Sequence, residues 1–181
     1  IGRAERFVET IKRTHRFVSE TKEWHVCEDG VWRKTDEKQV LHQAFLFIKQ
    51  DAQRIAGMED DRDREEAIVD YRRYANRSGV SNVTVLASVR LLAQLDEFDT
   101  DDDALSVNDG WVDLRTNRRY GTDASKMFSL SCAARYSPFD RAELWRKTVN
   151  EVFNGDKGLI EYFQKAAGYS MLGDNREQVM F

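Results

Sequence analysis

The chain has 181 residues, of which 41% are hydrophobic and 33% charged, so it can bury a core and is not a disordered or low-complexity tract. Its formal net charge of −4 excludes a nucleic-acid binder that relies on bulk positive charge. The longest apolar stretches, residues 44–48 and 83–87, are far shorter than the roughly 20 residues that cross a bilayer, so we expect a soluble, cytoplasmic protein with no membrane partner.

The amino-terminal part alternates between helical and extended patterns. Apolar residues at helical spacing predict an amphipathic helix over residues 3–20. A β-hairpin is predicted next, near residues 23–34. From Trp24 to Trp32 the sequence has the two-residue period of a strand, and Asp29-Gly30 is a dipeptide that suits a two-residue turn.

Three helical patterns come next. A helix capped by Thr35 or Asp36 runs to Gly57, with Phe45 counted on its apolar face. The almost wholly charged stretch 59–66 leads into a helical pattern that Ser78-Gly79 breaks, and another helix begins at Ser81 or Asn82.

The carboxy-terminal part begins with extended segments. Residues 105–121 predict two linked hairpins, and Asp140 is expected to cap a helix that ends at Asn154-Gly155. A last helix begins near Leu159. The predicted fold class is therefore mainly α (α+β), a helical domain with short β-hairpins, and residues 1–181 are predicted to form a single domain.

Three separate motifs follow one another along the chain. The first contains Trp24, Asp29-Gly30, Trp32 and Asp36. The second runs from Leu105 to Thr116, with Gly110 and the Asp113-Leu114-Arg115-Thr116 run, and the third runs from Phe153 to Gly173. Together they resemble the accessory domain of phage and plasmid primase-helicases and of the poxvirus primase-helicase. The resemblance gives these positions a structural role in the motifs: Trp24, Gly30, Trp32, Gly110, Asp113, Leu114, Thr116, Gly155, Gly168 and Tyr169.

The chain departs from the family pattern at three places. Asn117 stands where the family usually has glycine, and Asp109 where it usually has asparagine; both suit turns that need left-handed geometry. The family's usual Cys-Pro spacer is missing before residue 140, which shortens that connection.

The resemblance also implies a context. In that family the domain lies between a primase module and a superfamily 3 helicase, whose Walker A loop is expected just beyond residue 181. The parent is then a primase and ATP-dependent helicase that works as a homohexamer in a bacterial host cell. ATP and Mg²⁺ are expected in the adjoining helicase, and this fragment has no cofactor. Gly168 and Gly173 have the glycine spacing of a phosphate-binding loop, but Asp174-Asn175 follow where lysine is required.

Two groups of arginines are the nucleic-acid-binding candidates, because guanidinium groups suit phosphate and nearby aromatic rings can stack on unpaired bases. One group is predicted on a helix and the other on a hairpin: Arg72, Arg73 and Arg77; Arg115, Arg118 and Arg119. The alternative for each group is pairing with neighbouring carboxylates. The predicted partners are single-stranded or forked DNA and the adjoining helicase and primase domains.

No catalytic or metal site is predicted. The acidic residues of segment 96–103 lack the spacing of a calcium-binding loop, which favours a solvated loop over a metal site or a metal-dependent nuclease. The resemblance implies a non-catalytic accessory domain that aids ring assembly and DNA guidance. The alternative is a module that recruits replication proteins without touching DNA, which the net acidity favours.

Overall fold

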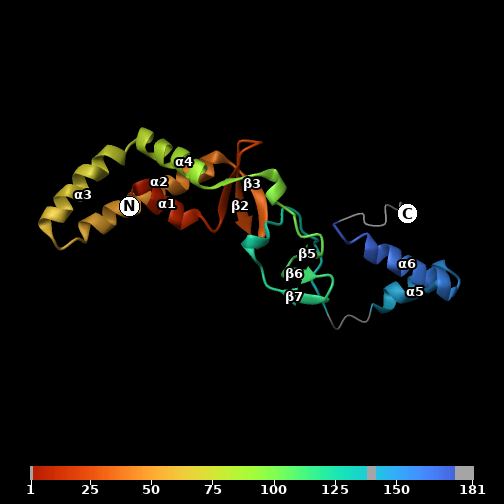
Figure 1. The fold of residues 1–181 in the computed structure, drawn as a ribbon. Coiled ribbons are helices and arrows are strands. Elements are labelled where there is room, and N and C mark those ends of the chain that lie inside the picture. The colour runs from red at the N-terminus through yellow and green to blue at the C-terminus, as the bar shows by residue number, and fades with distance from the viewer. Residues whose placement is uncertain (1, 138–141, 174–181) are drawn as a thin grey trace. The chain divides into compact units, whose positions relative to one another are not determined.

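A computed structural model describes residues 2–137 and 142–173 (Figure 1). The chain divides into two compact units, residues 1–28 with 32–98 and residues 29–31 with 99–181. The described residues form six α-helices and two small sheets of short strands, which confirms the α+β fold class. That residues 1–181 make a single functional domain stays a prediction. No helix in the described residues is long and apolar enough to cross a membrane.

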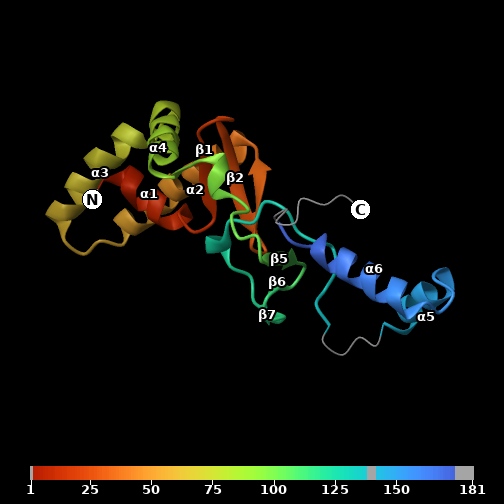
Figure 2. The ribbon, with the colours of Figure 1, turned by 45° about the vertical axis from the view of Figure 1, so that its right-hand side comes forward.

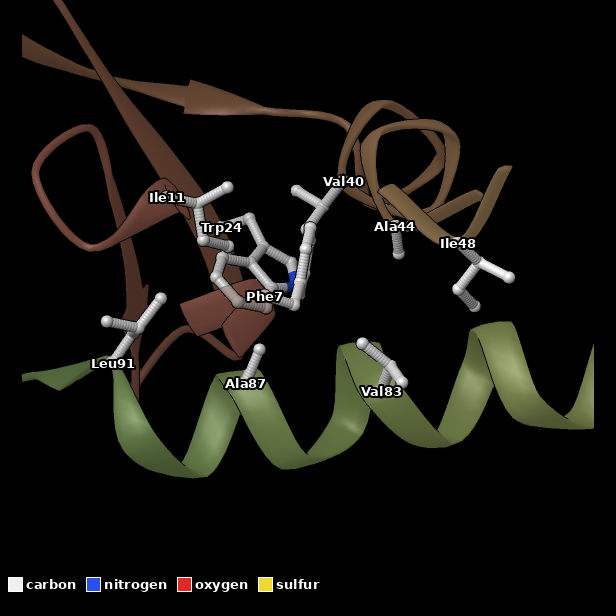
Figure 3. Packing of buried hydrophobic residues seen from close by; sticks show 9 residues of the cluster. All are labelled: Phe7, Ile11, Trp24, Val40, Ala44, Ile48, Val83, Ala87 and Leu91. Carbon is white, nitrogen blue, oxygen red and sulfur yellow. The ribbon is translucent and has the colours of Figure 1, made fainter. Parts of the chain in front are cut away.

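The first unit contains four helices that pack through one apolar core. They are α1 (Arg3–Ile11), α2 (Glu37–Ala56), α3 (Asp61–Tyr74) and α4 (Arg77–Arg90). The core cluster draws side chains from α1, α2, α4 and strand β2 (Glu23–Glu28), as Figure 3 shows, with the Trp24 indole among them. Asp36 caps α2 through the backbone N–H of Lys38, and Gly57 ends it, as predicted.

The sheet of the first unit has the strand order β3-β2-β1-β4. Its other strands are β1 (His15–Val18), β3 (Val31–Thr35) and β4 (Leu92–Ala93). β1 is antiparallel to β2, with Phe17 opposite Trp24, and parallel to β4. Asp29 and Gly30 have φ of 52° and 82°, the left-handed values of the predicted β2–β3 turn.

The helix predicted over residues 3–20 is wrong beyond Ile11. The next positions on its apolar stripe are Thr14 and the imidazole of His15, so the stripe cannot continue. Residues 15–18 instead become a central strand whose backbone pairs with neighbours on both sides. The pairing with β2 is a local hairpin, whereas β4 comes from residues 92–93, so that second pairing is not visible in the local pattern.

The boundary between α3 and α4 also differs from the prediction. Asp60 caps α3 through the N–H of Asp63, so the charged stretch 61–66 is helical, and α4 begins at Arg77 rather than at residue 81 or 82. Gly79 does not break the helix. A Cβ there would lie 2.2 Å from the Tyr74 carbonyl oxygen, so glycine allows the first turn of α4 to approach the end of α3.

The second unit contains an antiparallel sheet of β5 (Ala104–Val107), β6 (Gly110–Asp113) and β7 (Arg118–Tyr120), in that order, which confirms the two linked hairpins (Figure 2). Gly110 has a φ of 139°, and a Cβ there would lie 1.9 Å from the Tyr120 carbonyl oxygen. Asn117 adopts the expected left-handed geometry with a φ of 53°. Asp109 does not, and its carboxylate instead accepts a hydrogen bond from the Tyr136 N–H.

The same unit ends in the helices α5 (Glu143–Val152) and α6 (Lys157–Tyr169). Asn154 and Gly155, with φ of 48° and 75°, end α5 as predicted, and Asp156 caps α6. Gly168 lies inside α6 and is therefore helical rather than part of a loop. Two short 3-10 turns complete the described elements, Leu95–Glu97 and Ala124–Lys126. The predicted cap Asp140, residues 138–139 before it and Asp174-Asn175 lie outside the described residues.

Candidate nucleic-acid interface

The first arginine group lies where α3 ends and α4 begins. Arg72 and Arg73 occupy the last turn of α3, and Arg77 is the first residue of α4; all three are exposed. Within residues 2–137 and 142–173, no ion pair joins any of them to a carboxylate. The ion pairs within α3 belong to its amino-terminal half, where Arg62 meets Glu66 and Arg64 meets Asp61.

A groove of about 510 Å³ opens at the same junction. Its lining comes from α2, the end of α3 and the start of α4: Phe45, Ile48, Lys49, Tyr71, Ala75, Asn76, Arg77 and Val80. Most of these side chains are apolar, Lys49 and Arg77 supply two cations, and no carboxylate is among them. The Asn76 side chain is already occupied, since it caps α4 through the Gly79 N–H and donates to the Arg73 carbonyl oxygen.

A buried ionic cluster stands beside the tyrosines of α3. Asp51 of α2 is almost fully buried and lies 2.9 Å from the Nε of Arg3, which is equally buried. Arg6 donates two hydrogen bonds of 3.0 Å to the same carboxylate, and Arg54 donates one of 2.9 Å. Burial raises the pKa of Asp51, but the hydrogen bonds from Arg6 and Arg54 and the charges of Arg6 and Arg3 outweigh it and hold the pKa below its usual value.

The guanidinium of Arg3 also fixes two aromatic rings. Its Cζ lies 5.7 Å from the ring centroid of Tyr71 and 5.1 Å from that of Tyr74. Such cation–π contacts hold a ring in place. The Tyr71 ring that lines the groove is therefore anchored through Arg3 to Asp51.

The second arginine group lies on the sheet of the second unit and is partly neutralised. Arg115 lies 3.3 Å from Asp103, and Arg119 pairs with Asp109. Only Arg118 of this group lacks an ion pair in the part of the chain that the structure describes. The Asp113 carboxylate accepts hydrogen bonds from the backbone N–H groups of Arg115 and Thr116, which fixes the turn after β6.

The aromatic rings near this second group stack on one another. Trp111 and Tyr120 stack at 4.4 Å between ring centroids, and the Nζ of Lys126 lies 4.2 Å from the Trp111 centroid. The pKa of Asp113 is lowered from its usual value, mainly by the hydrogen bond from the Thr116 backbone N–H and less by the other hydrogen bonds from Thr116 and Arg115. This arrangement is a stabilised turn more than an open binding surface.

In the acidic segment 96–103, the aspartates from Asp99 onward make contacts inside the second unit rather than gathering around a cation. Asp99 accepts a hydrogen bond of 2.8 Å from the Ser129 N–H, Asp101 pairs with Lys126 and Asp103 with Arg115. Among the described residues, no three His, Cys, Asp or Glu side chains are grouped so that they would hold a metal ion.

Sequence reasoning found the arginines but missed the groove. Phe45 was assigned to the apolar face of its helix, yet 51% of its surface is exposed. A usable signal was present, because Phe45 and Lys49 are four residues apart and so share one face of α2. The partner side chains from α3 and α4 depend on tertiary packing.

A family model described as D5 N terminal like matches residues 4–154. The chain therefore belongs to the D5 N-terminal-like family, the accessory domain that precedes the superfamily 3 helicase in primase-helicases. No curated protein matches the chain significantly.

Proposed function

We propose that this domain guides single-stranded or forked DNA toward the helicase motor of its parent protein and helps the motor's ring to assemble. It does so without catalysis of its own, and ATP and Mg²⁺ act in the adjoining helicase. The observation that carries the DNA part of this proposal is the arginine group at the α3–α4 junction. Its three arginines are exposed and make no ion pair in the described structure, and Arg77 lines a groove together with Lys49.

This local patch can bind phosphate although the whole chain is acidic. Salt screens charges over about 8–10 Å, so a phosphate at the junction responds mainly to the nearby cations. Arginine forks match phosphate oxygens, and they bind most strongly where no carboxylate competes. The acidic amino-terminal half of α3 keeps DNA from that end of the helix.

The test is fluorescence anisotropy of the chain with single-stranded, duplex and forked DNA at two salt concentrations. Arg72→Glu/Arg73→Glu is expected to weaken binding to single strands by about tenfold or more and to flatten its salt dependence, since each lost phosphate contact lowers the slope by roughly 0.7. Arg62→Glu is the matched control, because it reverses an exposed cation on the same helix about 15 Å away, at 1.5 Å per residue. Equal binding by the unaltered chain, Arg72→Glu/Arg73→Glu and Arg62→Glu would contradict the DNA role.

A second candidate function is recruitment of replication proteins without DNA contact. It is favoured by the exposed apolar side chains Val85 and Val89 on α4, which point away from the buried face formed by Val83 and Ala87. Exposed apolar patches commonly mark protein contacts. Absence of DNA binding, together with capture of a partner that Val85→Lys/Val89→Lys abolishes, would favour this candidate.

A further inference from the structure

The groove between α2 and the α3–α4 junction combines two kinds of surface that one ligand class requires together. Phe45, Ile48 and Val80 supply an apolar lining to which the Tyr71 ring is added. Lys49 and Arg77 bring positive charge to the same groove. Three other hollows of the described residues have carboxylates in their linings: Glu5 in one, Glu23, Asp36 and Glu37 in a second, and Asp99, Asp101 and Asp102 in a third.

We propose that this groove holds one unpaired base of a DNA single strand, with the adjoining phosphate on Arg77 and Lys49. The proposal rests on the proposed DNA-guiding function and names the site that carries it. A base has an apolar face next to an anionic backbone, which is the combination that the groove complements. Proteins that bind single strands without strong sequence preference use such aromatic platforms beside cations.

The size and the exposure of the groove favour a single base over a duplex. A groove of about 510 Å³ has room for one nucleotide but not for a double helix, whose bases are stacked inside. The Phe45 side chain is half exposed, and the His42 imidazole stacks beside its ring at 6.5 Å between centroids, so a base would use the exposed part of the ring that His42 does not cover. Unpaired bases are therefore the part of a fork that this surface would select.

The groove is also held in shape before a ligand arrives. The contact between Tyr71 and the Arg3 guanidinium is anchored by the ion pair of Arg3 with Asp51 at 2.9 Å. Gly79 lets α4 approach the end of α3, which places Arg77 at the edge of the groove. A preformed site loses less conformational entropy on binding, so a single base can contribute measurably.

The experiment compares a thymidine oligonucleotide with an abasic oligonucleotide of the same length and phosphate number. The unaltered chain is expected to bind the thymidine strand at least about fivefold more tightly, because stacking of one base on an aromatic ring has that effect. Phe45→Ala is expected to remove this difference and Phe45→Tyr to retain it. Leu46→Ala is the matched control, since Leu46 is the neighbouring exposed apolar residue and does not line the groove. Circular dichroism and thermal melting check that each variant is folded.

The outcomes separate this proposal from the one on which it rests. Equal binding of both oligonucleotides, still sensitive to Arg72→Glu/Arg73→Glu, overturns the base site and leaves the DNA-guiding role standing. The same holds if Phe45→Ala keeps the preference for thymidine, which places the base elsewhere. Absence of binding to either strand overturns both proposals, and the apolar lining would then belong to a protein partner.

Discussion

At the scale of single residues, the ionic cluster around Asp51 determines much of the stability near the candidate site. Three arginines, Arg3, Arg6 and Arg54, converge on one buried carboxylate. Burial alone would penalise each charge, so the cluster is favourable only while its members neutralise one another. Arg3 depends on this arrangement most, because its side chain is almost fully buried.

We expect Asp51→Asn to lower the free energy of unfolding by about 3–5 kcal/mol, because it leaves the Arg3 guanidinium buried without its full counter-charge. Urea denaturation followed by circular dichroism measures this difference. Asp70→Asn is the control: Asp70 also pairs with Arg3, at 3.3 Å, but its side chain is 54% exposed, so a loss of at most about 1 kcal/mol is expected. Similar losses for the two variants would contradict the importance of burial.

His15 gives the first unit a dependence on pH. The imidazole is buried at the start of β1, and burial lowers its pKa, with a smaller opposing effect from a hydrogen bond to the Ile11 backbone. The unfolded chain, with a histidine pKa of about 6.5, then binds a proton more readily than the folded chain. The contribution of His15 to stability is therefore complete above about pH 6.5 and is lost as the pH falls toward the lowered pKa.

The expected result is a falling melting temperature between about pH 7 and pH 5, with a shallower fall in His15→Gln. His42→Gln is the control for replacing a histidine as such, because His42 is exposed on α2. Asp51 acts in a different window: its lowered pKa means that its stabilisation is lost only as the pH falls below about 4. A slope that survives His15→Gln would place the titration on another group.

At the scale of elements, the α3–α4 junction depends on one glycine. We expect Gly79→Ala to cost about 1–3 kcal/mol, because the new Cβ would meet the Tyr74 carbonyl oxygen at 2.2 Å and the two helices would have to separate. The same displacement should weaken single-strand binding, since Arg77 begins α4. Ser81→Ala, at an exposed position of the same helix, should change stability by less than about 0.5 kcal/mol. Chemical denaturation of the two variants measures this difference in the free energy of unfolding.

Elements with strong local signals were predictable from the sequence. α2 has a capping aspartate, an apolar stripe and a terminal glycine, and the β2–β3 turn has Asp29-Gly30, so both were predicted close to their observed bounds. The errors arose where tertiary contacts decide the structure. β1 is extended because it pairs with β2 and β4. Gly79 lies in the first turn of α4, which Asn76 caps, and the end of α3 comes so close that a Cβ would not fit there.

At the scale of the whole molecule, the candidate site was only partly predictable. Position and residue type identified Arg72, Arg73 and Arg77, whose location at the helix junction follows from the caps Asp60 and Asn76. The groove could not be predicted, because its side chains come from three helices, and no local sequence pattern determines how those helices pack together. The ion pairs of Arg115 and Arg119 likewise depend on the folding of the β5–β7 sheet and the segment before it.

The exposed apolar face of α4 gives the ring-assembly part of the proposal its own test. Val85 and Val89 are 56% and 62% exposed, one turn apart, on the side of α4 opposite its buried residues. In the proposed full-length parent protein, Val85→Lys/Val89→Lys is expected to lower the mass of the proposed oligomer as measured by light scattering, because charge on an apolar contact must be desolvated. Gln50→Lys/Gln53→Lys adds the same charge at exposed positions of α2 and should leave the mass unchanged. If both variants keep the oligomer intact, subunit contacts do not use this face, and its apolar side chains are then best explained by binding of another protein.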